Sequence, residues 1–211
     1  MTTLFNDKWQ FAELPLDYDS MFKDGNPVLF YPQQFLDKAG SLSYKSVTLP
    51  HDWMIGHVKD LYKNSVGFYK KSFTLTGEEV SHRRNAIRFE GVYMNCGIWV
   101  NGSLAGEWKY GYSTFEFDIS NFVKEGQNEI IVIVVYQNCN TRWYSGAGIF
   151  RDVTYINTPL THLPTDGLYI CAKPASKDLA DGQVDTSKMT YSEMMNFSKE
   201  NPEMYAEFMK N

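Results

Sequence analysis

The chain has 211 residues, and its 20 Lys and Arg against 25 Asp and Glu give a formal net charge of −5. This balance excludes a nucleic-acid binder that works by bulk attraction to phosphate, because such proteins need clustered basic residues. Hydrophobic residues make up 43% of the chain and aromatic residues 16%. A disordered chain is thereby excluded, and a fold rich in strands is favoured.

No pattern typical of a disulfide framework, a metal site or a membrane span is visible. The three cysteines, Cys96, Cys139 and Cys171, are an odd number without zinc-ligand spacing, and the four histidines are scattered. The N-terminus lacks the basic and apolar regions of a secretory signal, and the longest apolar run, residues 130–136, is far too short to span a bilayer. We therefore expect a cytoplasmic protein without a metal ion or cofactor and without a membrane partner.

From residue 8 to about 172, short β-branched and aromatic runs alternate with clusters of turn residues, as in a sandwich or barrel. Residues 86–90 alternate between apolar and polar, which predicts a strand with one wet face. Asn101 and Gly102 between two apolar runs predict a hairpin turn. Residues 129–136 are apolar on both faces and predict a central strand, and residues 152–157 resume the strand pattern. Because no stretch between these strands resembles a crossover helix, we expect antiparallel layers.

The C-terminal part of the chain has a different character. From Ser187 onward the strand pattern stops, and five of the nine methionines occur there. Thr190 and Glu193 fit a capping box, and Asn201 before Pro202 fits the start of a second helix. The sequence thus predicts a β-sandwich over residues 1–172, a polar linker over 173–186 and a Met-rich helical tail over 187–211.

Two stretches could carry chemistry. In the first, His51 stands beside Asp52, but neighbours in an extended segment point to opposite faces and cannot share one proton path. We therefore expect a structural role there, in which Asp52 caps a turn and Trp53 packs.

The second stretch, residues 138–148, follows the predicted central strand and joins amides, a guanidinium and two aromatic rings to a glycine-rich turn. Sugars need this mixture, because aromatic faces cover the C–H side of a pyranose while Asn and Arg bond its hydroxyls. A packed turn with Trp143 in the core is an equally good interpretation of the residues alone.

Other known catalytic and cofactor-binding motifs are incomplete in this sequence. The glycines at 146 and 148 lack the third glycine of a dinucleotide loop, since Arg151 stands in its place, and Ser145 lacks the nucleophile elbow of a hydrolase. Nothing in the sequence pairs two carboxylates across a cleft. No complete catalytic set is visible.

Six motifs carry a resemblance to a known family. In chain order they are residues 49–53 (LPHDW), 67–73 (GFYKKSF), 89–95 (FEGVYMN), 99–102 (WVNG), 110–115 (YGYSTF) and 142–151 (RWYSGAGIFR). Together they resemble the N-terminal sugar-binding domain of glycoside hydrolase family 2, which contains β-galactosidases, β-glucuronidases and β-mannosidases. The resemblance covers about residues 5 to 172.

This resemblance implies an all-β, jelly-roll β-sandwich of the galactose-binding-domain type. It also implies a multidomain parent enzyme whose two catalytic glutamates lie in a (β/α)₈ barrel, and no residue of this sequence matches either glutamate. The expected function is a non-catalytic carbohydrate-binding domain, or a truncated form of such an enzyme, that is inactive alone. The expected partners are a carbohydrate such as a β-galactoside and the missing barrel.

By the same resemblance, the segment that contains Asn140, Arg142 and Trp143 helps to shape the site for the non-reducing sugar. The segment is short and lacks the Asp by which relatives with a longer acidic loop contact a cation, so no metal role is expected. The alternative function is a structural or protein-interaction sandwich that self-associates through the Met-rich tail.

Overall fold

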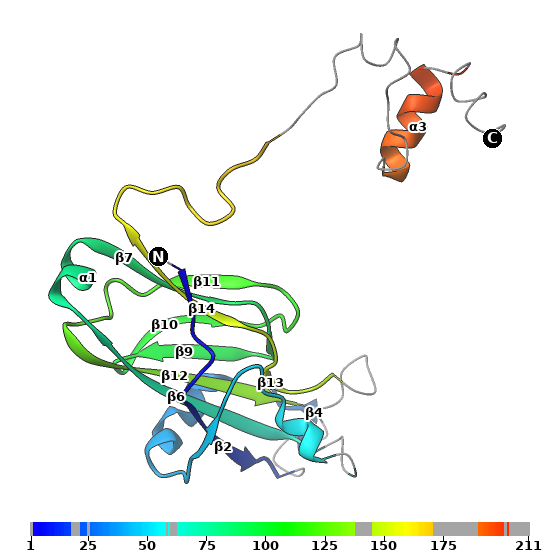
Figure 1. Cartoon of the computed structure of the whole chain (residues 1–211). Helices are drawn as coiled ribbons and strands as arrows, with labels where there is room; N and C mark the ends of the chain where they lie inside the picture. Colours follow the sequence, from blue (N-terminus) through cyan, green and yellow to red (C-terminus); the bar gives the residue numbers. More distant parts are fainter. Residues whose placement is uncertain are drawn as a thin grey trace. The chain divides into compact units, whose positions relative to one another are not determined.

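The structure is a computed structural model that describes residues 2–17, 22–24, 26–57, 59, 63–137, 145–170, 190–200 and 202. The chain divides into two compact units, Met1–His162 and Leu163–Asn211. The first unit holds every sheet described (Figure 1). The predicted domain boundaries at residues 172 and 187 fall in the stretch 171–189, which lies outside the described residues, and they stay predictions.

Two antiparallel sheets form the first unit. The four-stranded sheet has the order β1 (Thr2–Leu4), β14 (Val153–Pro159), β7 (Arg83–Phe89) and β11 (Phe115–Asp118). The six-stranded sheet has the order β10 (Ser103–Trp108), β9 (Cys96–Val100), β12 (Gly126–Tyr136), β6 (Ser65–Leu75), β2 (Trp9–Pro15) and β5 (Lys45–Val47). Two small pairs complete the set, β13 (Gly148–Ile149) with β8 (Val92–Tyr93) and β3 (Phe22–Lys23) with β4 (Asn26–Pro27). The predicted all-β sandwich with antiparallel layers is confirmed.

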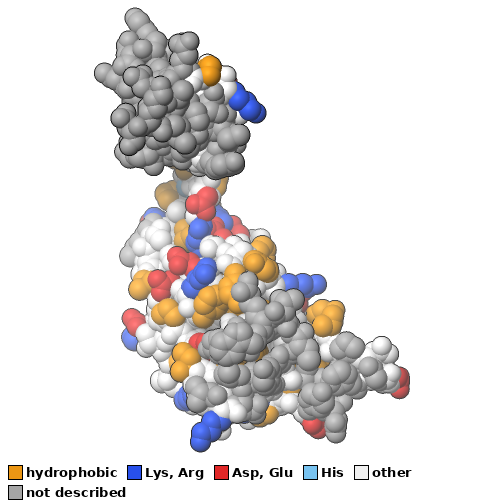
Figure 2. All heavy atoms as spheres, turned by 90° about the vertical axis from the view of Figure 1, so that its right-hand side faces the viewer, with side chains coloured by type: hydrophobic (Ala, Val, Ile, Leu, Met, Phe, Trp, Pro, Cys, Tyr) orange, Lys and Arg blue, Asp and Glu red, His pale blue; other side chains and the backbone are white. Residues whose placement is uncertain are grey.

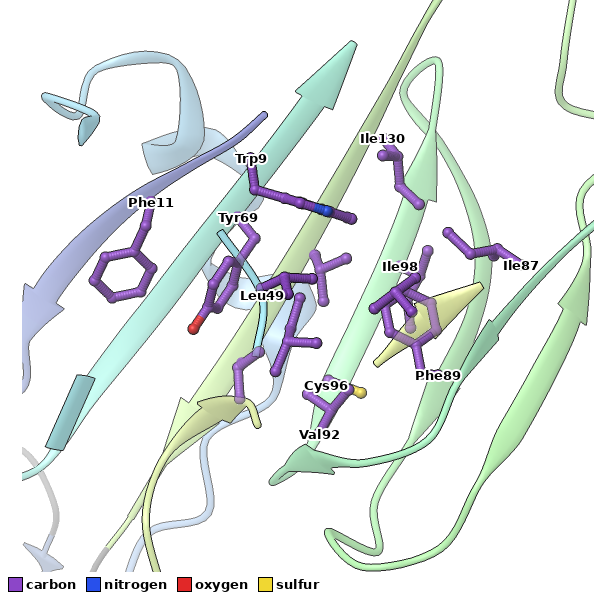
Figure 3. Packing of buried hydrophobic residues seen from close by; sticks show 14 of the residues in the cluster. Trp9, Phe11, Leu49, Tyr69, Ile87, Phe89, Val92, Cys96, Ile98 and Ile130 are labelled. Carbon is purple, nitrogen blue, oxygen red and sulfur yellow. The ribbon is translucent and has the colours of Figure 1, made fainter. Parts of the chain in front are cut away.

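The main core lies between the two sheets. Trp9 and Tyr69 come from the six-stranded sheet and Ile87 and Phe89 from the four-stranded one, and all four side chains are almost completely buried (Figure 3). Burying large apolar side chains of this kind contributes about 1.5–3 kcal/mol each. The interior between the layers is therefore mainly apolar, and buried amides such as those of Asn85 and Asn157 are hydrogen-bonded to each other.

A second, smaller core covers part of the outer face of the six-stranded sheet. Phe68 and Ile133 pack there against the 3₁₀ helix η2 (Pro32–Gly40), which contributes Ala39 and Phe35. On β12 the even-numbered residues thus face the other sheet while Ile133 and Val135 face η2, because successive side chains of a strand alternate. This double burial explains why the predicted central strand is apolar on both faces.

Tight turns and short helices connect the strands. Asn101 and Gly102 have positive φ and join β9 to β10, which confirms the predicted hairpin. The short helix α1 (Gly77–Ser81) starts at a capping box between Thr76 and Glu79. The 3₁₀ helix η3 (Trp53–His57) follows the His51–Asp52 pair. None of these short helices is predicted from the sequence pattern.

In the second unit the described helix is α3 (Tyr191–Glu200). Glu193 accepts hydrogen bonds from the backbone and hydroxyl of Thr190, and Thr190 accepts one from the Glu193 backbone, so the predicted capping box is confirmed. The predicted second helix lies almost wholly outside the described residues. No helix in the described part of the chain has the length and apolarity needed to cross a bilayer.

Candidate functional site

The predicted sugar-contacting residues Asn140, Arg142 and Trp143 all belong to residues 138–144, which lie outside the described residues. Their placement therefore stays a prediction. The structure does describe both flanks of this segment, Gln137 at the end of β12 and Ser145 ahead of β13. What can be built from the structure is the frame that holds the two flanks.

The first flank is fixed by the Gln137 side chain. Its amide oxygen accepts a hydrogen bond from the backbone N–H of Phe30 at 2.9 Å, and its amide nitrogen donates one to the carbonyl of Val28 at 2.9 Å. The side-chain amide of Gln137 thus bonds to the backbone of residues 28–30 as both acceptor and donor, which is the pattern that the backbone of a neighbouring strand would make. The preceding Tyr136 is 1% exposed, and its ring centroid lies 6.4 Å from that of Tyr93. The segment therefore leaves β12 from an anchored position.

The second flank is fixed by the turn at residues 51–53. The Asp52 carboxylate accepts hydrogen bonds from the backbone N–H groups of Met54 and Ala147, both at 2.9 Å. Backbone bonds run from His51 N–H to the Ile149 carbonyl at 2.8 Å and from Trp53 N–H to the Ala147 carbonyl at 3.1 Å. One carboxylate therefore caps its own turn and ties the turn to the chain that enters β13.

Glycine is required where the two backbones meet. Gly148 has φ +125°, and a Cβ there would lie 2.5 Å from the His51 carbonyl oxygen and 2.4 Å from the Tyr69 hydroxyl. Gly146, at φ +67°, would place a Cβ 2.6 Å from Asp52 Oδ2. Real Cβ atoms do not approach other atoms so closely, so the glycine-rich turn seen in the sequence serves this close contact.

The same turn explains why His51 and Asp52 do not form a proton relay. Asp52 is engaged by two backbone N–H groups, whereas His51 Nδ1 lies 2.8 Å from the hydroxyl of Tyr69. Burial lowers the pKa of His51, Lys45 lowers it further, and Asp52 opposes both. Burial raises the pKa of Tyr69 well above its ordinary value. Both rings are thus held neutral, and the predicted structural role of Asp52 is confirmed.

Trp53 packs as predicted. Its side chain is 5% exposed, its indole N–H donates a hydrogen bond to Ser65 Oγ at 2.9 Å, and its ring centroid lies 5.4 Å from that of Phe11. It therefore stabilises the turn and presents no free face to a ligand.

A charged cluster lies nearby. His57 Nε2 is 3.1 Å from Glu13 Oε2, and Lys63 Nζ is 3.6 Å from Glu13 Oε1. Glycoside hydrolysis by the usual mechanism needs two carboxyl groups about 5–10 Å apart across a sugar. Glu13 is already paired with two bases and Asp52 with backbone, so these two carboxylates are not such a pair. Among the described residues, no group of three or more His, Cys, Asp or Glu could hold a metal ion.

Exposed apolar side chains accompany these polar groups. Figure 2 views the end of the first unit at which β12 finishes and shows hydrophobic side chains with charged ones between them. Large hydrophobic side chains that are exposed in the described segments before η2, in η3 and between β10 and β11 are Leu29, Tyr31, Ile55 and Tyr110. The role of Gln137 is not visible in the sequence, because its partners at residues 28–30 lie more than a hundred positions away.

Comparisons with known proteins place this frame in a family. Residues 5–159 match the family described as glycosyl hydrolases family 2, sugar binding domain. The chain is 31% identical over 139 residues to a β-galactosidase of Bacteroides ovatus, a match that covers 60% of this chain and 16% of that protein. It is 27% identical over 205 residues to a β-galactosidase of Staphylococcus xylosus, covering 87% of this chain and 19% of the relative.

Solved structures agree. A glycosyl hydrolase family 2 member from Bacteroides cellulosilyticus superposes with a TM-score of 0.55 at 29% identity over 75% of this chain and 21% of that one. A β-glucuronidase from Bacteroides uniformis has the same fold, with a TM-score of 0.58 at 21% identity over 79% of this chain and 19% of that one. The chain thus spans about a fifth or less of the length of these relatives. It belongs to glycosyl hydrolase family 2 as a sugar-binding domain.

Proposed function

We propose that this chain is a non-catalytic carbohydrate-binding domain whose segment 138–144 contributes to the site for a non-reducing sugar. In this proposal Trp143 covers the apolar face of the pyranose, while Arg142 and Asn140 bond its hydroxyl groups. The observation that carries the proposal is the anchoring of both flanks, by Gln137 on one side and Asp52 on the other.

Anchored flanks matter because binding costs free energy when a mobile loop must be ordered. Gln137 and Ala147 are ten positions apart, and each is held by hydrogen bonds of 2.9 Å. In this proposal, these two anchored positions support the sugar-contacting segment. The family membership supports a carbohydrate as the ligand.

The proposal of a non-catalytic role is supported by the partners of two carboxylates, those of Asp52 and Glu13. Asp52 is tied to backbone N–H groups and Glu13 to His57 and Lys63, so neither is placed as the partner of a second carboxylate. Hydrolysis with retention or inversion requires such a pair. The β-galactosidases named above are several times longer than this chain, and their activity is proposed here only for a larger protein that contains such a domain.

The experiment is a calorimetric titration of the full chain with galactose, glucuronate and mannose, repeated with Arg142→Ala and Trp143→Ala. We expect millimolar affinity for at least one sugar. Arg142→Ala should weaken it by about tenfold or more, because a hydrogen bond to a charged group contributes about 1.5–3 kcal/mol. Trp143→Ala should weaken it by about two- to tenfold, because a ring face contributes about 0.5–1.5 kcal/mol. Tyr169→Ala removes an aromatic ring that is 88% exposed and serves as the matched control.

Equal affinity of all three variants would overturn the assignment of the segment. A separate assay with p-nitrophenyl glycosides tests catalysis, for which we expect no turnover above buffer. Robust turnover by the pure chain, retained after a second purification, would contradict the non-catalytic role.

A further inference from the structure

A groove of about 600 Å³ lies at the opposite end of β12 from segment 138–144. It forms where β2 begins. Gln10 pairs with Lys70, but β6 continues to Leu75 with β12 as its ladder partner, so a step is left beside β6. The volume falls within the range of about 300–1,000 Å³ that is typical of small-molecule sites.

Strand alternation places its polar residues on one face. Phe68 belongs to the cluster that packs under η2, and Lys70 and Ser72 follow it on the same face of β6. Ser72 is opposite Glu129 on β12. The groove is therefore the uncovered continuation of the face that η2 covers farther along.

The groove is cationic in a chain whose net charge is −5. Lys8 and Lys70 line it, against the carboxylate of Glu129. Lys71 also borders the groove, but its side chain lies on the opposite face of β6, where Tyr69 and Phe73 pack. Neither Lys8 nor Lys70 has an ion pair among the described residues. Two ammonium groups against one carboxylate leave an excess of one positive charge, so the groove complements an anion.

Lys70 is held in place by an aromatic ring. Its Nζ lies 4.7 Å from the ring centroid of Tyr44. This cation is thus positioned before a ligand arrives, and less free energy is lost when the ligand binds.

The remaining lining carries short polar groups. Gln10, Ser46, Thr48 and Ser72 supply an amide and three hydroxyls. Within the described parts of the chain these four side chains have no hydrogen-bond partner, so they are available to the hydroxyl groups of a ligand.

The aromatic residues of the groove lining indicate which class of ligand fits it. Among the described residues that line the groove, Trp9 is the aromatic one, and it is fully buried. A nucleobase needs an exposed ring to stack on, and a neutral pyranose also gains much of its affinity from one. Recognition here must depend on charge and hydrogen bonds.

We propose that this groove binds an acidic saccharide, a hydroxyl-rich ligand with carboxylate or sulfate groups, through Lys8 and Lys70. The site is separate from segment 138–144, because Glu129 and Tyr136 are seven residues apart on β12, about 23 Å at the rise of a strand. In Figure 1, β12 runs from the side of the sandwich that carries α1 to the side that carries β13.

The test is a calorimetric titration of the full chain with tetragalacturonate, a sulfated galactotetraose and the neutral galactotetraose. We expect either acidic oligomer to bind at least tenfold more tightly than the neutral one, and the comparison of the two acids identifies the preferred anion. Lys8→Gln with Lys70→Gln should weaken binding of the acid by about 4- to 25-fold, at about two- to fivefold per exposed charge. Glu129→Gln should tighten it by about two- to fivefold.

Lys109→Gln is the matched control. Lys109 is an exposed lysine between β10 and β11, and its replacement removes one positive charge, as each single substitution in the groove does. It should alter affinity by less than about 1.5-fold. The proposal is overturned if the neutral oligomer binds equally well, or if Lys109→Gln costs as much as the double variant. It is also overturned if Glu129→Gln weakens binding, or if inorganic sulfate binds as tightly as the sulfated oligomer. Because none of these variants touches segment 138–144, the outcome is independent of the sugar site proposed above.

Discussion

Replacement of Asp52 by alanine should destabilise the fold and loosen one flank of the proposed sugar segment. The substitution removes two hydrogen bonds of 2.9 Å to a charged acceptor and leaves the N–H of Ala147 without its partner in a fully buried position. A hydrogen bond to a charged group contributes about 1.5–3 kcal/mol, and a buried orphaned donor costs about 1–3 kcal/mol. Because Asp52 is only half-buried, we take the lower end of about 1.5 kcal/mol for each of the two bonds, with the orphaned N–H of Ala147 included in its bond, and expect a loss of about 3 kcal/mol.

Urea unfolding followed by tryptophan fluorescence measures this loss, and a domain of this size should melt about 6–12 °C lower. Asp52→Asn keeps an amide oxygen that can accept both bonds and should cost about 1 kcal/mol. Asp37→Ala on the exposed side of η2 is the matched control and should change stability by less than about 0.5 kcal/mol. If Asp52→Ala is as stable as Asp37→Ala, or if the Ala147 amide exchanges no faster with deuterium, the reasoning is refuted.

Two further predictions concern stability. Gly148→Ala should cost more than 2 kcal/mol because of the clash with His51, whereas Gly126→Ala, at φ +83° with nothing within 4 Å, should cost about 1 kcal/mol from strain alone; equal losses in urea unfolding would disprove the clash. Burial raises the pKa of the Cys96 thiol from 9.0 to about 12, so its contribution to stability is full below pH 9 and is lost as the pH rises toward 12. Unfolding of Cys96→Ala between pH 8 and 11 should therefore be less sensitive to alkali than that of the parent, and parallel pH profiles would contradict this.

Local patterns were sufficient for the strands. β12 is predictable because its apolar residues are consecutive, and the structure buries one set between the sheets and the other under η2. The hairpin at Asn101 is predictable because few residues tolerate positive φ. In both cases the signal lies within ten residues of sequence.

The short helices were not predictable by the same means. α1 carries a capping box at Thr76 and Glu79, but its five residues are too few to show a helical period. η2 exists because Phe35, Leu36 and Ala39 cover the outer face of a sheet formed by distant strands. Tertiary packing, which local propensity does not contain, decides such elements.

In the candidate sites, too, the local features could be predicted from the sequence and the long-range contacts could not. That Asp52 caps a turn follows from its neighbours in the sequence, but its bond to Ala147 joins residues 95 positions apart. The cationic groove draws Lys8, Ser46, Lys70 and Glu129 from four separate stretches, and only the strand register brings them together. Sequence reasoning could find the individual lysines but had no means to place them side by side.

The most direct test of the sugar-binding role is the nuclear magnetic resonance of the tryptophan indoles during titration with galactose, glucuronate and mannose. The indoles of Trp9 and Trp53 are bonded inside the protein, to Phe5 and Ser65, and serve as internal references. The account predicts a saturable shift of the Trp143 indole signal at millimolar sugar, with those two references unmoved. An unmoved Trp143 signal with all three sugars, in a chain that is folded by the same spectrum, would contradict it.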